Sequence, residues 1–507
     1  MSDFDLLTPL KRHWGYEGFR PLQERIVQSL LAGRDIAVVM PTGGGKSLCY
    51  QLPALILGRT AVVISPLIAL MQDQGAQLGQ MGIPAALLNS TLSASEQEKV
   101  IRRAIAGEYR LLYLSPERLA RADTISWLSR TPIAFFAIDE AHCISEWGHE
   151  FRPDYRQLSA LRENFPGLPI AAFTASATRR VRHDILAQLR LHDPEKFIAS
   201  FRRPNLRYLV RQCDTRTQSR LLVSALRAHE GENVIVYAPT IARVGETVQF
   251  LAQCGIQAIG YHGKMDTERR RHNQERWMAD EVPVLVGTLA FGLGINKPSV
   301  RAVIHLALPK SIEQYYQEAG RAGRDGLPAD CALLWQKRDA GLLAYFIEAL
   351  QDPGEKERAW QRYHAMRHFA EAQECRHRQI CTHFGETPKW TACGMCDVCA
   401  GAPEWMDKPE AERAPKKRKK QDRAAKPAGG DGGLVDHMRE WRRATAKRSG
   451  VPAYVIMHDS TLEEICRRRP SSTTELLEIH GIGIRKAEMY GSEILSALEG
   501  YSPAGQL

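Results

Sequence analysis

One short stretch constrains the fold more than any other part of this chain, because it joins a strand, a glycine-rich turn and a helix. The apolar run from Ile36 to Val39 predicts a buried strand, and a helical pattern begins after Ser47. The residues between them include three consecutive glycines, which let backbone N–H groups approach phosphate oxygens at a helix N-terminus. A strand, a loop and a helix in this order predict a phosphate-binding loop.

The polar residues of this loop suit a nucleoside triphosphate with magnesium. Lys46 is expected to reach the β- and γ-phosphates, and the Ser47 hydroxyl is expected to bind Mg²⁺. The backbone supplies the other phosphate contacts, through Thr42, Gly43, Gly44 and Gly45. Met40 stands where the strict pattern has glycine, so the alternative is a glycine-rich turn with a chance Lys-Ser pair.

Apolar runs and helical patterns alternate after this loop. The runs cover residues 61–66, 110–118, 133–138 and 170–174. Apolar strands separated by helices predict a parallel sheet covered on both faces, with ligands at the carboxyl ends of its strands. Asp139 and Glu140 follow the third run, where we expect Asp139 to hold magnesium and Glu140 to activate the attacking water. An ordinary polar strand end is the alternative, and the loop upstream argues against it.

Aromatic residues flank this predicted site on both sides. Upstream, Tyr16 can stack on an adenine and Gln23 can hydrogen-bond its edge, although Tyr16 is equally suited to a core. Downstream, residues 143–155 gather Trp, His, Phe, Arg and Tyr around Gly and Pro. Such a loop either stacks on bases and reports that contact to the nucleotide, or caps the domain as a small hydrophobic core.

A second alternating α/β region follows, with predicted strands within residues 233–237, 256–263, 282–288 and 302–306. It contains no phosphate loop, which suggests that it lends groups to the first site. Arg321 and Arg324 suit that role, because guanidinium groups match phosphate oxygens and stabilise the charge that develops in phosphoryl transfer. The alternative is that both are ordinary surface arginines.

Cysteine usage indicates a metal site within an intracellular protein. No apolar run approaches the ~20 residues of a membrane span, and the first residues lack a signal-peptide pattern. Most of the eleven cysteines are therefore expected to be reduced. Four have the spacing of a closed tetrahedral site: Cys375, Cys393, Cys396 and Cys399. Zinc and an iron–sulfur cluster both suit four thiolates, and Cys381 is an alternative fourth ligand.

The composition changes near residue 403. Residues 403–433 are charged and rich in Pro and Gly, which predicts a disordered basic linker. Its run at 416–420 either holds nucleic-acid phosphates or is a solvated tether, and the net charge of +10 suits a polyanionic partner. Residues 434–507 read as short helices of a small all-α domain. The turn at 481–483 either presents N–H groups to a phosphate or joins two helices.

Taken together, these motifs resemble the RecQ family of DNA helicases within helicase superfamily 2. The resemblance covers most of residues 8–400 and rests on PTGGGKS at 41–47, SPLIALMQDQ at 65–74, DEAHCISEWGHEFRPDY at 139–155, FGLGINKP at 291–298 and QEAGRAGRDG at 317–326. The last domain resembles the helicase-and-RNase-D C-terminal (HRDC) domain. The family would have a Cys, a hydroxyl residue and an Arg after Tyr237, where this chain has Ala238 and Pro239.

The resemblance implies roles for particular residues. Tyr16, Arg20 and Gln23 match the family's adenine-recognition motif, and Arg321 and Arg324 match its arginine-finger motif. It favours zinc at the cysteines. It implies that the aromatic segment couples DNA binding to ATP hydrolysis, with the expected contacts Trp147, His149, Phe151, Arg152 and Tyr155. Residues 174–178 resemble the motif that links the ATP site to strand separation, and Asn296 and Lys297 are expected to line the interdomain cleft.

The implied fold class is α/β, with two RecA-like domains that have parallel sheets, then a helical zinc-binding module, the disordered basic linker and the small all-α domain. The expected boundaries are 1–205, 206–338, 339–402, 403–433 and 434–507. Longer members of the family carry a winged-helix domain after the zinc module, and no room for one is apparent between Cys399 and Leu434.

The implied function is an ATP-dependent 3′–5′ DNA helicase that uses ATP, magnesium and zinc in DNA repair, recombination or replication. A DNA-stimulated translocase that remodels DNA with little unwinding is the main alternative. An RNA helicase is disfavoured by the zinc module and the last domain, and a non-catalytic DNA-binding scaffold would require defects in the ATP motifs. The expected partners are single-stranded, tailed or branched DNA and a single-stranded-DNA-binding protein. We expect a monomer without membrane contact, in the cytoplasm of a bacterium and associated with the nucleoid.

Overall fold

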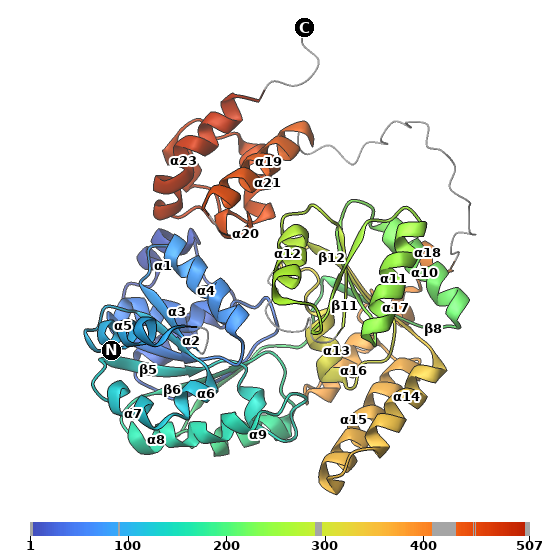
Figure 1. The fold of residues 1–507 in the computed structure, drawn as a ribbon, viewed down its shortest axis with the longest axis horizontal. Helices are drawn as coiled ribbons and strands as arrows, with labels where there is room; N and C mark the ends of the chain where they lie inside the picture. Colours follow the sequence, from blue (N-terminus) through green and yellow to red (C-terminus); the bar gives the residue numbers. More distant parts are fainter. Residues whose placement is uncertain are drawn as a thin grey trace.

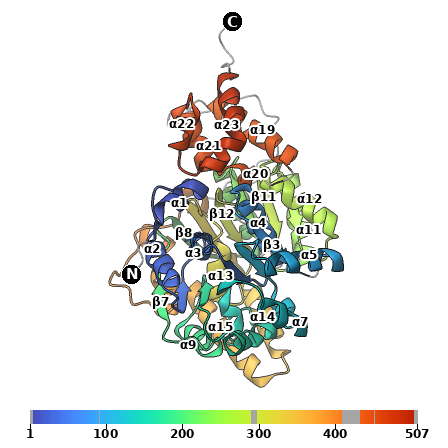
Figure 2. The ribbon, with the colours of Figure 1, turned by 90° about the vertical axis from the view of Figure 1, so that its left-hand side faces the viewer.

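The computed structural model describes residues 4–89, 92–288, 297–407, 432–449, 451 and 453–501. Within these residues two parallel sheets are flanked by helices, and a separate group of helices lies across both domains (Figures 1 and 2). The predicted fold class is confirmed: two α/β domains, a helical region that carries the clustered cysteines and an all-α C-terminal domain. Residues 408–431, most of the predicted linker, lie outside the described residues.

The first domain, from α1 to β7, is built on a seven-stranded parallel sheet with the order β3-β4-β2-β5-β6-β1-β7. Its strands are β1 (Ile36–Val39), β2 (Thr60–Ile64), β3 (Ala85–Leu88), β4 (Leu111–Leu114), β5 (Ile133–Ile138), β6 (Ile170–Thr174) and β7 (Glu195–Ile198). Its helices are α1 (Leu7–Trp14), α2 (Gln23–Leu31), α3 (Leu48–Leu57), α4 (Ile68–Gln80), α5 (Ala94–Ile105), α6 (Pro116–Leu119), α7 (Ala122–Leu128), α8 (Ala160–Asn164) and α9 (Arg179–Gln188), with the 3-10 turns η1 (Ala141–Ile144) and η2 (Pro153–Ser159).

Both faces of this sheet are covered, as continuous apolar strands require. Phe136 and Ile138 of β5 belong to one apolar cluster, whereas the alternate residues Phe135 and Ala137 belong to another. The sequence analysis did not predict β3 and β7, which form the two edges of the sheet. Edge strands are covered less completely, and the burial of β3 and β7 is interrupted by partly exposed residues.

The second domain, from β8 to β13, has a six-stranded parallel sheet with the order β10-β11-β9-β12-β13-β8. Its strands are β8 (Leu206–Gln212), β9 (Asn233–Tyr237), β10 (Ala258–Tyr261), β11 (Val284–Gly287), β12 (Val300–His305) and β13 (Ala329–Trp335). Its helices are α10 (Thr215–Ala228), α11 (Ile241–Gln253), α12 (Thr267–Met278) and α13 (Ile312–Ala319). The sequence analysis missed the pair β8 and β13. Charged residues interrupt their pattern, and in the fold Arg207 of β8 pairs with Asp330 of β13 at 2.8 Å.

Two helical regions complete the described chain. The cysteine region contains α14 (Lys337–Glu348), α15 (Pro353–Glu371), α16 (Arg376–His383), α17 (Asp397–Ala400) and α18 (Glu404–Asp407). The C-terminal domain contains α19 (Gly432–Ser449), α20 (Ala453–Ile456), α21 (Asp459–Arg468), α22 (Thr473–Leu477) and α23 (Ile484–Glu499). Local signals set these boundaries: α15 begins where Asp352 accepts the Glu355 N–H and Pro353 occupies the first turn. Among the described residues, no helix combines the length and apolarity that a bilayer crossing needs.

Candidate active site

The predicted nucleotide-binding residues meet at one edge of the first sheet. The phosphate loop follows β1, Asp139 and Glu140 follow β5, and Thr174 ends β6, which lies between those two strands. Because parallel strands present their carboxyl ends at the same edge, this strand order brings the loop and the carboxylates together.

The phosphate loop requires glycine at two of its positions. Gly43 and Gly45 have φ of 81° and 82°, a region that side chains disfavour. Met40 is not a defect in the loop, because its side chain is buried in the core while its carbonyl accepts a hydrogen bond from Lys46 Nζ at 3.1 Å. Burial lowers the pKa of Lys46, and the charges of Glu140 and Asp139 oppose that shift.

The two carboxylates after β5 lie in different surroundings. Burial raises the pKa of Asp139 and the neighbouring Glu140 raises it further, while the charge of Lys46 opposes the shift. Burial also raises the pKa of Glu140, but its hydrogen bond with His142 and the charge of His142 outweigh burial and lower it. Glu140 is therefore held as a carboxylate, whereas Asp139 would gain from another positive charge beside it.

A chain of polar contacts runs from these carboxylates to the second domain. Glu140 lies 3.2 Å from His142 Nδ1, and the same nitrogen lies 3.0 Å from the Thr174 hydroxyl. The Thr174 hydroxyl donates to the Ser176 carbonyl, and the Ser176 hydroxyl accepts from Gln317 Nε2 at 3.0 Å. Gln317 belongs to α13, so polar contacts that begin at Glu140 reach the second domain through five residues.

The arginine pair of the second domain lies against the phosphate loop. A methyl group on Gly43 would be 3.5 Å from the Cα, Cβ and Cγ atoms of Arg324. Burial lowers the pKa of Arg324 to about 9, with Arg321 and Arg203 adding to the shift. Arg324 thus stays charged at neutral pH within a cluster of cations that a bound polyanion would stabilise.

Arg203 is a residue that the sequence analysis missed. Its Nη1 donates to the Thr42 carbonyl at 2.8 Å, and its Nη2 donates to the Gly323 carbonyl at 3.2 Å. It therefore ties the phosphate loop to the arginine motif, although it belongs to neither. The only sequence signal was a basic pair before Pro204, between the two α/β patterns.

Two residues of the predicted adenine motif contact the phosphate loop, and the third contacts the C-terminal domain. Gln23 Nε2 donates to the Gly45 carbonyl at 3.1 Å, and Arg20 Nη1 donates to the Gly43 carbonyl at 2.5 Å. Tyr16 instead stacks on His480 of the C-terminal domain, with ring centroids 4.8 Å apart and planes 16° from parallel.

The aromatic segment packs beside Asp139 and Glu140, through contacts of Trp147 and His149. Trp147 has the Arg180 guanidinium 3.0 Å and the Arg358 guanidinium 5.4 Å from its ring centroid. His149 stacks on His142 at 4.6 Å. These contacts join the segment to α9, to α15 and to the residue that holds Glu140.

Three further residues of the segment, Phe151, Arg152 and Tyr155, make different contacts and differ in burial. Phe151 is half-buried under the guanidinium of Arg156, and Arg152 Nη1 donates to the Pro66 carbonyl at 3.2 Å. Tyr155 is fully buried, and its hydroxyl donates to the Asp139 carbonyl at 3.0 Å. Tyr155 is thus positioned to support the end of β5 and has no exposed face for a base.

The motif at 291–298 is described only in part, because Asn296 lies outside the described residues. Lys297 is buried, its ammonium lies over the ring of Trp277, and it pairs with Asp280 at 2.6 Å. In this structure Lys297 is therefore an internal cation of the second domain.

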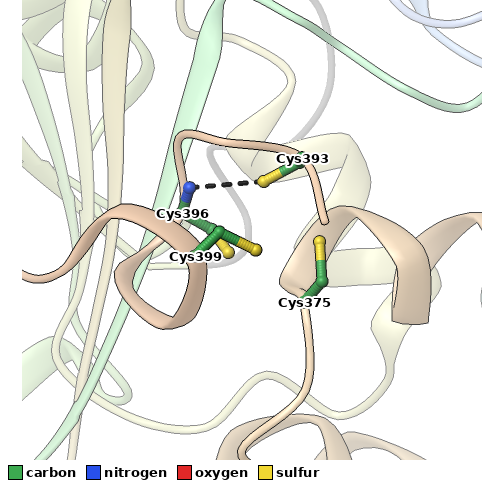
Figure 3. Close-up of side chains that lie close together, drawn as sticks. All are labelled: Cys375, Cys393, Cys396 and Cys399. Carbon is green, nitrogen blue, oxygen red and sulfur yellow. Dashed lines mark hydrogen bonds between the residues drawn. The ribbon is translucent and has the colours of Figure 1, made fainter. Parts of the chain in front are cut away.

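The four clustered cysteines converge, as Figure 3 shows. The sulfur atoms of Cys375, Cys393, Cys396 and Cys399 all lie within 4.8 Å of one another. Cys381 is not a member of this group of described residues. The Cys393 sulfur accepts the Cys396 N–H at 3.3 Å and the Met395 N–H at 3.4 Å, contacts that favour a thiolate. The donor set fits a closed structural zinc site.

This site fastens the cysteine region to the second domain. Asp397, the residue after Cys396, accepts the Val210 N–H of β8 at 3.1 Å and pairs with Arg376 at 3.0 Å. Arg376 also donates to backbone carbonyls at the end of α15. A bound metal would therefore hold a loop to which both α15 and β8 are attached.

Replacing Cys396 with serine is expected to remove the bound zinc and to loosen this attachment. Zinc measured by atomic emission should fall from about one equivalent per chain to background, and Tm should fall by about 5–10 °C. Cys213→Ser is the matched control, because Cys213 lies outside the group. Full zinc content in Cys396→Ser would contradict the assignment.

Four domain families match consecutive parts of the chain. They are DEAD/DEAH box helicase over residues 20–185, the helicase conserved C-terminal domain over 217–326, RecQ zinc-binding over 337–400 and the HRDC domain over 431–498.

Curated relatives match over different shares of their own length. ATP-dependent DNA helicase RecQ of Haemophilus influenzae is 42% identical, over 79% of this chain and 64% of the relative. The protein of the same name in Pasteurella multocida is 42% identical, over 79% of this chain and 63% of the relative. The chain thus spans less than two thirds of these two relatives. RecQ of Bacillus subtilis is 32% identical, over 97% of this chain and 98% of the relative.

Solved structures share the fold at low identity. The DUF1998 helicase MrfA, bound to DNA and AMPPNP, has a TM-score of 0.54 and 19% identity, over 66% of this chain and 51% of that one. The DEAD-box helicase Mss116, bound to ssRNA and UDP-BeF, has a TM-score of 0.53 and 16% identity, over 68% of this chain and 78% of that one. At these identities the likeness establishes the arrangement of the two sheet domains alone.

Proposed function

This chain belongs to the RecQ family of helicases, and from that premise we propose that it is an ATP-dependent motor that moves 3′ to 5′ along single-stranded DNA and unwinds duplexes. The observation that carries the proposal is that groups suited to binding one nucleotide converge from two domains. The phosphate loop and both carboxylates come from the first domain, while Arg321 and Arg324 come from the second. Hydrolysis at such a site changes the contacts between the two domains, and this change moves the domains relative to each other.

Each residue of the site has a place in the proposed reaction. Lys46 binds the terminal phosphates, and Glu140 orients the attacking water. Arg324, with Arg321, stabilises the charge that develops on the transferred phosphoryl group. Ser47 and Asp139 would hold magnesium, which supplies positive charge to the phosphates. Burial and the neighbouring Glu140 raise the pKa of Asp139, and the charge of a magnesium ion would oppose both effects.

The DNA strand is proposed to run over the aromatic segment. Trp147 and Phe151 offer rings for base stacking, and Arg152 and His149 lie beside them. His149 stacks on His142, which holds Glu140, so a base that moves this segment would alter the position of the attacking water. The 3′–5′ direction rests on the family relation.

We also propose that this chain lacks the winged-helix domain. The alignment with the Bacillus relative runs over 582 positions, more than the 507 residues of this chain, so that relative carries residues for which this chain has no counterpart. Strand separation would then depend on the two sheet domains and the C-terminal domain. We propose a monomer that acts on tailed or branched DNA at the nucleoid, in the bacterial cytoplasm, alongside a single-stranded-DNA-binding protein.

A strand-displacement assay tests the proposal. The protein with ATP is expected to unwind a 3′-tailed duplex and to leave 5′-tailed and blunt duplexes intact. Glu140→Gln should bind ATP and DNA but hydrolyse ATP about 10²- to 10⁴-fold more slowly, because the water is no longer activated. ATPase activity that DNA stimulates without any displaced strand would favour the translocase. Stimulation by RNA in place of DNA would favour an RNA helicase.

A further inference from the structure

The C-terminal domain rests on the first domain at the residues that precede the phosphate loop (Figure 1). The Gly481 N–H donates to the Gly15 carbonyl at 3.1 Å. The backbones approach so closely that a Cβ on Gly15 would lie 2.6 Å from the Ile482 carbonyl carbon, and one on Gly483 would lie 2.7 Å from the Arg12 carbonyl oxygen. The glycine turn at 481–483 therefore both joins α22 to α23 and docks the domain.

The same domain also reaches the second domain. Arg442 of α19 lies 3.5 Å from Asp280 and 2.7 Å from Asp459. Asp280 in turn pairs with Lys297. Burial raises the pKa of Asp459, but the charge of Arg442 and a hydrogen bond to Ser299 outweigh burial and lower it. Figure 1 places α20 above the junction of the two sheet domains, with α4 of the first domain on one side and α12 of the second on the other. The domain thus bridges both halves of the nucleotide site.

His480 lies where a base would be recognised. Its imidazole is a flat nitrogen heterocycle, stacked nearly parallel on the Tyr16 ring as an adenine would be. The charge of Arg20, another residue of the adenine motif, reaches the same imidazole. The outer face of His480 remains exposed, so the ring is held by this stack and by the backbone of its turn.

We propose that the C-terminal domain is a reversible gate on the nucleotide site, in which His480 takes the place of adenine on Tyr16, so that ATP and the docked domain compete. The proposal rests on the assignment of this site to ATP in the proposed function. The competition concerns the base alone, because within the described residues no hydrogen bond joins the C-terminal domain to the phosphate loop.

The burial of titratable groups favours undocking of the C-terminal domain. Burial lowers the pKa of Lys486 to about 8, with no opposing acidic group. Burial lowers the pKa of His458 to about 4, and the charge of Lys486 lowers it further. The desolvated Lys486 ammonium weakens the docked state, whereas His458 is neutral there, so an incoming base can displace His480.

The test compares a nucleotide with its phosphates alone, using the whole chain without DNA. AMP-PNP is expected to bind His480→Ala about three- to tenfold more tightly than the unaltered protein, because one aromatic stack no longer competes. His480→Phe keeps a ring on Tyr16 and should retain the unaltered affinity. Inorganic tripolyphosphate should bind all three proteins equally. Arg467→Ala, an exposed change on α21, is the matched control and should match the unaltered protein.

Calorimetric Kd values separate the outcomes. An unchanged AMP-PNP affinity in His480→Ala would overturn the gate, and so would an equal gain for tripolyphosphate or a His480→Phe variant that behaves like alanine. Absence of AMP-PNP binding in the unaltered protein would instead overturn the nucleotide assignment itself. Hydrogen exchange gives a second measurement without mutation: AMP-PNP should increase exchange in residues 479–486 of the unaltered chain, and tripolyphosphate should not. Protection of that segment by both would count against the gate.

Discussion

Replacing Lys46 with alanine is expected to abolish DNA-stimulated ATP hydrolysis, with a loss of about 10³-fold or more. The Lys46 ammonium is buried at the phosphate loop and donates to the Met40 carbonyl. Lys46 belongs to the loop itself, and among the described residues no other lysine side chain occupies this position. Removal leaves the terminal phosphates without the loop's own charge-assisted donor in a site of low dielectric, where such contacts count most.

Phosphate release at saturating ATP, with and without single-stranded DNA, measures this effect. Lys99→Ala is the matched control, because Lys99 is an exposed lysine of the same domain. We expect Lys99→Ala to keep full activity. If Lys46→Ala also keeps full activity, the phosphate-loop assignment is wrong.

Arg324→Ala is expected to lower kcat by about 10³- to 10⁵-fold while changing the ATP affinity far less. Arg324 comes from the second domain, and its Cα, Cβ and Cγ atoms lie beside Gly43. The charge of its guanidinium is of most use once phosphoryl transfer begins. Arg324→Lys should not restore the rate, because an ammonium lacks the planar fork that matches phosphate oxygens.

Single-turnover hydrolysis and nucleotide-binding measurements distinguish the two quantities. Arg271→Ala, on the exposed surface of α12, serves as the control and should leave both unchanged. A rise in KM with an unaltered kcat would show that Arg324 binds ATP without acting in the transition state.

The parts of this site that the sequence predicted are local. The phosphate loop, the Asp139-Glu140 pair and the cysteines after residue 390 each carry their meaning within a few consecutive residues. Alternation of apolar runs with helical patterns was enough to predict parallel sheets. It was not enough for β3 and β7, since edge strands lack the continuous burial that marks a central strand.

The parts that the sequence did not predict depend on contacts between distant residues. Arg203 joins Thr42 to Gly323, and nothing near it in the sequence indicates either partner. Tyr155 resembled its aromatic neighbours, yet its ring fills the core and its hydroxyl holds the Asp139 carbonyl. The stack of Tyr16 on His480 joins the two ends of the chain, and no local pattern specifies such a pair.

The polar contacts from Glu140 to Gln317 have a mechanical consequence. Coupling between the binding of nucleotide and the binding of DNA is reciprocal. A contact with the DNA strand that favours one nucleotide state would therefore be stronger in that state. A strand held under tension would then shift the affinity for ATP, and an opposing load would slow hydrolysis as well as movement. In the proposed motor, the hydrogen bonds that transmit movement from the ATP site would also transmit a load back to that site, so ATP hydrolysis would slow when movement is blocked.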